Sequence, residues 1–319
     1  MSGFHPDLLP TARFIPRFSF TDRKLRALRW LTGLRRTPRP PTLDDVVVED
    51  HEAPGPDGAP DVPVRLYRPR DAAGPVPCMV WIHGGGFIIG DAYQDEKALL
   101  ALVRQLGIAV VSVEYRLAPE HPFPAPTEDC YAALRWVHTD ADELGVRADR
   151  LAVGGASAGG GLAASVALLA NDRGEVPLCL QLLVYPMLDD RTVLRTDVDD
   201  AHLRLWSTRS NRFGWSAYLG HEPGGDGTDP IAAPARREDL TGLPPAWIGV
   251  GTCDLFHDED IDYATRLGTA GVPCDLHVAD GGYHAFDMVQ AKAEVSRAFR
   301  AGSVAALRQA LLDPTGTPR

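Results

Sequence analysis

Short apolar runs alternate with amphipathic stretches along most of the chain after Pro41. In most of these runs the apolar residues stand at consecutive rather than alternate positions, so both faces of the strands that they form should be buried. Runs of this kind separated by helices are typical of a mostly parallel sheet that is covered on both faces. The pattern predicts strands at 46–49, 62–67, 78–83, 108–113, 151–154, 178–185, 247–250 and 275–278.

The amphipathic stretches between these runs predict the covering helices. They lie at 94–106, 128–138, 159–170, 258–270 and 291–311. In an open α/β sheet, ligands bind beyond the carboxyl ends of the strands. The residues that follow the predicted strand ends are therefore the first candidates for chemistry.

Residues 1–45 have a different character, because they are rich in arginine and proline. Positions 22–34 predict an amphipathic helix, with Leu25, Leu28, Leu31 and Leu34 at helical spacing. A basic amphipathic helix can lie on a membrane surface, but packing against its own protein is the commoner use and is what we expect.

Composition narrows the class of protein. The 319 residues suit one large domain, or one domain with a small accessory cap. The formal net charge of −11 disfavours nucleic acid as a partner. No run of about 18 apolar residues is present, so we expect no stable membrane insertion. Residues 1–16 are broken by prolines and lack the apolar stretch of a secretory signal.

The five cysteines are scattered, with no CxxC pair and no cysteine–histidine cluster. This spacing favours reduced, mostly buried thiols in a cytoplasmic protein and does not indicate a zinc site. We therefore expect a cytoplasmic protein that uses no metal and no organic cofactor.

One candidate nucleophile follows the predicted strand 151–154, where the chain reads Gly-Ala-Ser-Ala-Gly at 155–159 and a helical stretch begins at once. A G-x-S-x-G sequence between a strand and a helix is typical of a sharp turn that lifts the serine hydroxyl, here that of Ser157, above the sheet. Flanking glycines are needed because the neighbouring backbone comes close, and the following helix points its positive end at the site. The alternative is a glycine-rich turn with an incidental serine.

A serine hydroxyl needs a base, and a histidine base needs a carboxylate that fixes its tautomer. His284 follows the predicted strand 275–278 in a glycine-rich loop that can reach the serine, and Asp254 follows the strand 247–250. The acidic residues at 258–260 open a predicted helix, where they suit the helix dipole and need no catalytic role. Serine, aspartate and histidine stand in the chain order of α/β-hydrolases.

Acyl transfer also needs backbone N–H donors that meet the oxyanion. The sequence HGGGF at 83–87 follows a predicted strand, and its glycines let the backbone approach a ligand and turn its N–H groups toward it. Ala158, directly after the candidate nucleophile, supplies another donor. A mobile glycine linker is the other interpretation, but a linker rarely begins at the end of a buried strand.

These residues resemble the hormone-sensitive-lipase-like branch of α/β-hydrolase esterases, and the resemblance covers nearly the whole chain. The matching segments are HGGGF (83–87), EYRLAPEHPFPA (114–125), GGASAGGGLA (154–163), YPMLDD (185–190), NRFGWSAYLG (211–220), GTCDLFHDED (251–260) and GYHAF (282–286). By matching position, the resemblance implies Ser157 as nucleophile, Asp254 as acid and His284 as base. It implies an oxyanion hole from the backbone of Gly85, Gly86 and Ala158, with Gly84 in the same loop.

The resemblance also implies an α/β-hydrolase fold with a small helical cap. The cap would comprise residues 1–45 and an insertion at about 188–240, on a catalytic domain that spans 46–319. One position departs from the family pattern, because Ala156 stands where an acidic residue or threonine is usual. A homodimer through the strand at 273–279 and the C-terminal helix is a further expectation by analogy.

The function implied is a serine carboxylesterase that hydrolyses short- to medium-chain esters of small molecules through an acyl-enzyme. An amide or lactone hydrolase stays open, since the same triad serves acyl transfer generally. A protein that binds a small ligand without hydrolysis would resemble plant hormone receptors of this family. Those receptors typically lose a triad member, whereas this chain keeps all three.

Overall fold

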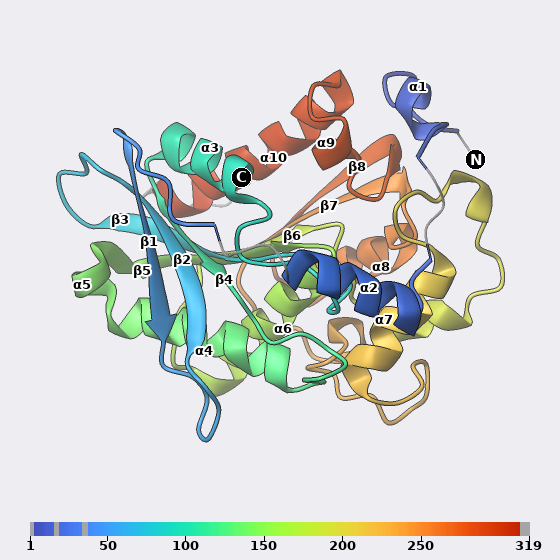
Figure 1. The fold of residues 1–319 in the computed structure, drawn as a ribbon, viewed down its shortest axis with the longest axis horizontal. Coiled ribbons are helices and arrows are strands. Elements are labelled where there is room, and N and C mark those ends of the chain that lie inside the picture. The colour runs from blue at the N-terminus through green and yellow to red at the C-terminus, as the bar shows by residue number, and fades with distance from the viewer. Residues whose placement is uncertain (1–2, 16–18, 34–37, 313–319) are drawn as a thin grey trace.

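The structure, a computed structural model, describes residues 3–15, 19–33 and 38–312. One eight-stranded sheet forms its centre (Figure 1). The strands are β1 (Val46–Ala53), β2 (Val62–Pro69), β3 (Val76–Ile82), β4 (Ala109–Val113), β5 (Val146–Ala156), β6 (Leu180–Val184), β7 (Ala246–Cys253) and β8 (Cys274–Tyr283). Their order in the sheet is β1-β2-β4-β3-β5-β6-β7-β8. β2 is antiparallel to its neighbours β1 and β4, and the other neighbouring pairs are parallel.

Helices cover both faces of the sheet, as the sequence predicts (Figure 1). α3 (Glu96–Leu106) and α10 (Glu294–Leu312) pack on one face. α4 (Ala125–Thr139), α6 (Ala158–Arg173) and α8 (His257–Thr269) pack on the other. Short helices lie between them, namely α1 (Leu9–Ala12), α5 (Ala141–Leu144) and α9 (Phe286–Val289).

β3 shows why consecutive apolar residues are needed in this sheet. Cys78, Val80 and Ile82 join the core under α4, α6 and α8, while Met79 and Trp81 join the core under α3 and α10. Successive side chains of a strand point to opposite faces, so a strand covered on both sides must be apolar at every position.

The insertion segment (residues 188–240) joins β6 to β7. It contains α7 (Thr208–Leu219) and three short 3-10 helices, η1 (Asp190–Leu194), η2 (Asp200–His202) and η3 (Pro234–Arg236). The N-terminal segment (residues 1–45) contributes α2 (Asp22–Gly33), which lies beside α7 in Figure 1. The Phe20 ring centroid is 5.9 Å from that of Trp206, and the Ser19 and Ser207 hydroxyl oxygens are 3.2 Å apart.

α2 packs on its own protein, as expected, because Leu25 is buried and Leu28 packs against the same core. Leu34, the last of the four predicted leucines, lies outside the described residues. No helix in the described part of the chain is both long and apolar enough to cross a membrane.

Candidate active site

Ser157 stands at the sharp turn between β5 and α6. Its backbone φ is +58°, in the left-handed region that serine rarely adopts, which is the strain expected of a nucleophile elbow. The glycines on either side are required by space. A Cβ atom on Gly155 would lie 2.3 Å from the carbonyl oxygen of Gly159, and one on Gly159 would lie 2.1 Å from that of Ile82.

Three of the predicted site residues come together in one chain of contacts. Nε2 of His284 lies 2.9 Å from Oγ of Ser157, and Nδ1 of His284 lies 2.8 Å from Oδ2 of Asp254. The second carboxylate oxygen of Asp254 accepts a hydrogen bond from the backbone N–H of Phe256. All three residues are buried, so water competes little for these contacts.

The sheet explains this meeting. Ser157, Asp254 and His284 each directly follow the last residue of a strand, β5, β7 and β8, and these strands are parallel with β6 between β5 and β7. The glycines before His284 belong to β8 itself rather than to the loop that the sequence suggests. Tyr283 pairs with Cys253, so the histidine and the aspartate leave neighbouring strands at the same level.

The predicted oxyanion loop follows β3. Gly85 and Gly86 have φ values of +129° and +60°, which favour glycine, and within the described residues no group accepts a hydrogen bond from their N–H groups. Gly84 lies against the elbow, since a Cβ atom there would be 2.8 Å from the carbonyl oxygen of Ala156. Ala158 begins α6, so its N–H belongs to the free first turn of that helix. Gly84 and Ala158 therefore lie next to the serine, and Gly85 and Gly86 follow Gly84 in the same loop.

His83 holds the base of this loop. It is fully buried and stacked on Tyr115 with ring centroids 4.2 Å apart. Burial lowers the pKa of His83 to about 4, so the ring is neutral near pH 7. Its Nδ1 lies 2.8 Å from the carbonyl oxygen of Gly84, and the Tyr115 hydroxyl donates to the His83 carbonyl.

The insertion segment packs directly on the oxyanion loop. A Cβ atom on Gly86 would lie 2.1 Å from the ring of Trp206, whose Nε1 donates to Asn211. Two further aromatic residues, Trp215 and Tyr218 of α7, are fully buried against Phe87. The aromatic residues of this segment thus serve packing.

Tyr185, directly after β6, is a site residue that sequence reasoning did not single out. Its ring meets the ring of His284 edge-on with centroids 4.9 Å apart, and its hydroxyl donates to the buried carboxyl of Asp287. Its φ is +37°, so the ring reaches the histidine from a strained backbone. The segment YPMLDD was the only available signal.

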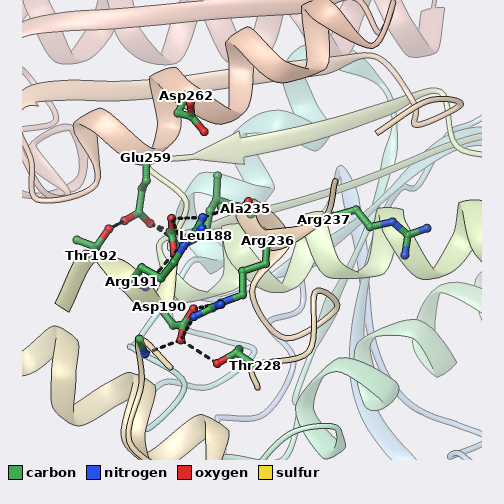
Figure 2. Close-up of polar contacts among 12 residues, drawn as sticks. Leu188, Asp190, Arg191, Thr192, Thr228, Ala235, Arg236, Arg237, Glu259 and Asp262 are labelled. Carbon is green, nitrogen blue, oxygen red and sulfur yellow. Dashed lines mark hydrogen bonds and ion pairs between the residues drawn. The ribbon is translucent and has the colours of Figure 1, made fainter. Parts of the chain in front are cut away.

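The acidic residues at 258–260 differ from the expectation of a solvated first helical turn. Asp258 is exposed, as expected, but Glu259 and Asp260 are buried. Glu259 accepts hydrogen bonds from Thr192 and from the backbone at Leu188, as Figure 2 shows. Burial raises the pKa of Asp260 well above its ordinary value, and the nearby charges of Glu259 and Asp254 act in the same direction.

A cavity of about 380 Å³ opens beside Asp254. It lies between the insertion segment, with Val198 and Leu203, and the residues around Asp254, with Leu255 among its apolar walls. Within the described ranges, no group of three or more histidine, cysteine, aspartate or glutamate side chains is placed to hold a metal ion.

Known proteins are similar to this chain in sequence and in fold. A family model described as the alpha/beta hydrolase fold matches residues 79–288. Carboxylesterase NlhH of Mycobacterium tuberculosis is 39% identical over 259 residues, 76% of each chain. Esterase LipI of the same organism is 35% identical over 283 residues, 88% of this chain and 87% of LipI.

The solved structure of a bacterial heroin esterase is also similar. It superposes with a TM-score of 0.88 at 41% identity and covers 97% of this chain and 98% of its own. The fold, the family match and the related esterases agree with one another. This chain therefore belongs to the α/β-hydrolase fold family, in its hormone-sensitive-lipase-like branch, and is a serine ester hydrolase of the carboxylesterase type.

Proposed function

We propose that the chain hydrolyses short- to medium-chain carboxylic esters through Ser157, His284 and Asp254 and an acyl-enzyme intermediate. The observation that supports this most directly is the unbroken series of contacts from Ser157 Oγ through His284 to Asp254. Contacts of 2.9 and 2.8 Å are short enough for proton transfer and for fixing the histidine tautomer.

In the first half-reaction, Ser157 Oγ attacks the ester carbonyl carbon while its proton passes to His284 Nε2. Asp254, which accepts the Nδ1–H of His284, stabilises the positive charge that develops on the ring. The N–H groups of Gly85, Gly86 and Ala158, with Gly84 in the same loop, meet the carbonyl oxygen as it becomes negative. His284 then gives its proton to the departing alcohol oxygen, which leaves the acyl group on Ser157.

In the second half-reaction, water repeats the same steps. His284 takes a proton from the water as its oxygen attacks the acyl carbon, and then returns a proton to Ser157 Oγ as the carboxylic acid departs. As proposed, the cycle uses only the ester, water and groups of the chain itself.

We further propose that the N-terminal segment and the insertion segment together form a cap that sets the substrate range. Trp206 touches the oxyanion loop at Gly86, and Arg29 of α2 donates hydrogen bonds to the carbonyl oxygens of Ile88 and Ala118. The cavity of about 380 Å³ beside Asp254 has the size of a small-molecule subsite.

The test is hydrolysis of 4-nitrophenyl esters with acyl chains from two to sixteen carbons, with Ser157→Ala in parallel. We expect an optimum at short to medium chains and a loss of at least a thousandfold in kcat for the variant. A matched 4-nitroanilide of the best acyl group separates ester from amide preference. A folded Ser157→Ala variant that keeps most of the activity would overturn the mechanism.

Two other expectations remain proposals. A cytoplasmic location is supported by the five cysteines, which are all free thiols. A homodimer through β8 is supported by Val278, which is 40% exposed on this edge strand. Light scattering at several protein concentrations tests the homodimer.

A further inference from the structure

The turn that follows β6, residues 185–189 (the β6 turn), contacts two of the three residues of the proposed triad. The backbone N–H of Met187 donates to the carbonyl oxygen of Ser157 at 3.0 Å. The ring of Tyr185 meets that of His284. Because the turn begins in a strained conformation, with φ of +37° at Tyr185, contacts beyond it must hold it in place.

Glu259 holds the far end of this turn. Its Oε1 accepts hydrogen bonds from two successive backbone N–H groups, of Leu188 at 2.7 Å and Asp189 at 3.1 Å. The hydroxyl of Thr192 donates to its Oε2, and Figure 2 shows the carboxylate between these donors. Glu259 is only 7% exposed, so these protein donors replace the water that a carboxylate otherwise needs.

Glu259 also belongs to the helix that begins just after the proposed catalytic acid. Glu259 lies in the first turn of α8, which begins three residues after Asp254. A single carboxylate therefore joins the β6 turn, which contacts Ser157 and His284, to the helix that follows Asp254. Asp262, on the same helix, points away from this cluster in Figure 2.

The residue after the β6 turn extends this connection to the insertion segment. Asp190 is fully buried and pairs with Arg236 at 2.6 Å, and it also accepts hydrogen bonds from Thr228 and from the N–H of Gly224 (Figure 2). The start of the insertion segment is thus tied to its end. The contacts that hold the β6 turn in place therefore also hold the two ends of the insertion segment in place.

We propose that Glu259 is a positioning residue for ester hydrolysis, which fixes the β6 turn and through it the places of Ser157 and His284. The inference rests on the proposed function, since it assigns Glu259 a part in the geometry of that triad. Its effect on the reaction is indirect, because Glu259 touches neither the serine nor the histidine. A misplacement of about 1 Å in a catalytic group can cost a hundredfold in rate.

Three substitutions separate this role from simple stabilisation. Glu259→Met keeps the volume but removes both acceptors, so Leu188 and Asp189 lose their partner. Glu259→Gln keeps an oxygen for the two N–H groups and can still meet the Thr192 hydroxyl. Glu259→Asp keeps the carboxyl group but withdraws it by one methylene. The control Glu96→Met removes a partner of the buried Arg65 in a cluster with Tyr67 on β2.

The measurement is kcat and KM on the best 4-nitrophenyl ester, with the melting temperature of each variant. We expect a fall in kcat of about 10- to 100-fold for Glu259→Met and about tenfold for Glu259→Asp, with KM changed less than threefold. Glu259→Gln should stay within threefold of the wild type. Glu96→Met should lower the melting temperature and leave kcat within twofold.

The inference is overturned if folded Glu259→Met, or Glu259→Asp where the methionine variant does not fold, keeps kcat within threefold. It is also overturned if Glu259→Gln falls as far as Glu259→Met. Ser157→Ala in the same assay distinguishes a failure of the positioning role from a failure of the proposed function. An inactive Ser157→Ala beside a fully active Glu259→Met refutes only the positioning role, whereas an active Ser157→Ala refutes the proposed function.

Discussion

Trp206 occupies the space that a side chain at Gly86 would need. A Cβ atom at Gly86 would lie 2.1 Å from the tryptophan ring, so the insertion segment rests on the backbone of the oxyanion loop without any intervening side chain. The proposed oxyanion loop and the proposed cap are therefore in direct contact, and we expect a substitution in either to displace the other.

Gly86→Ala should lower kcat by about a hundredfold on all esters, because the added methyl group displaces Trp206 and the φ of +60° is strained for alanine. Trp206→Ala alone should instead raise relative activity on bulkier esters. The double variant should recover only part of the loss, because the backbone strain remains. Steady-state kinetics on an acyl series measures all three, and full recovery in the double variant would contradict the role of backbone strain.

Asp254→Asn should lower kcat by roughly a thousand- to ten-thousandfold with little change in KM, because an amide no longer enforces the histidine tautomer. The amide oxygen can still accept the N–H of Phe256, so the fold should persist. The exposed Asp262 of α8, which pairs with Arg266, is the matched control. Asp262→Asn should be close to wild type, and an Asp254→Asn variant with a tenth of the activity would remove Asp254 from the proposed triad.

Glu114 should make stability depend on pH. Burial raises the pKa of this carboxyl from 4.5 to about 7, so its protonated form is the one that the fold favours. Its contribution to the free energy of unfolding is fully present below about pH 4.5 and is lost as pH rises through about 7. The loss amounts to about 1 to 3 kcal/mol for this partly buried group.

Glu114→Gln removes this titration while keeping an acceptor for the N–H of Ala92. Melting temperatures from pH 5 to 8 should therefore fall less for the variant than for the wild type. The exposed Glu49→Gln should follow the wild type. Parallel curves for wild type and Glu114→Gln would show that Glu114 is not the group responsible.

Tyr185→Phe should destabilise the fold by about 1 to 3 kcal/mol, because the buried Asp287 carboxyl loses its hydroxyl donor. The ring against His284 is kept, so kcat should change only a few-fold. Tyr185→Leu removes the ring as well and should lower kcat by about tenfold or more. Denaturant unfolding and steady-state kinetics on both variants test whether the hydroxyl serves stability and the ring serves the rate. Equal values of kcat for the two variants would contradict this separation.

The central strands were predictable because covered parallel strands must be largely apolar on both faces; β3 shows this over its whole length, and β4 at every position except Ser112. Six strands (β1, β2, β3, β5, β7 and β8) are longer than predicted, and β5 and β8 exceed their predicted lengths by the most. β5 begins at Val146 because the backbone of Val146 pairs with that of Val76. The positions just after Val146 include charged, exposed residues, so the side-chain pattern there does not indicate a strand. β8 continues through its glycines to Tyr283, which pairs with Cys253. Backbone pairing with the neighbouring strand therefore sets where β5 begins and where β8 ends, and the pattern of apolar and polar side chains does not reveal it.

The insertion segment resisted prediction for another reason. α7 mixes polar and aromatic residues, so it has no clear amphipathic pattern. Only its two ends carry helix signals: the side chain of Ser207 accepts a hydrogen bond from the N–H of Ser210, and Gly220 has the left-handed conformation. From the sequence, Glu259 and Asp260 were likewise expected to be solvated acidic residues in the first turn of a helix. Their burial depends on how the insertion segment folds back on α8. This long-range contact cannot be predicted from the local sequence pattern.

The ion pair of Asp190 with Arg236 brings the two ends of the insertion segment together at one point. The 45 residues between them therefore form a loop that this ion pair closes at its base. We expect that replacing this loop with that of a relative keeps the fold only where the ion pair is preserved, and that it changes the rate as well as the substrate range, because Trp206 of the loop packs on Gly86.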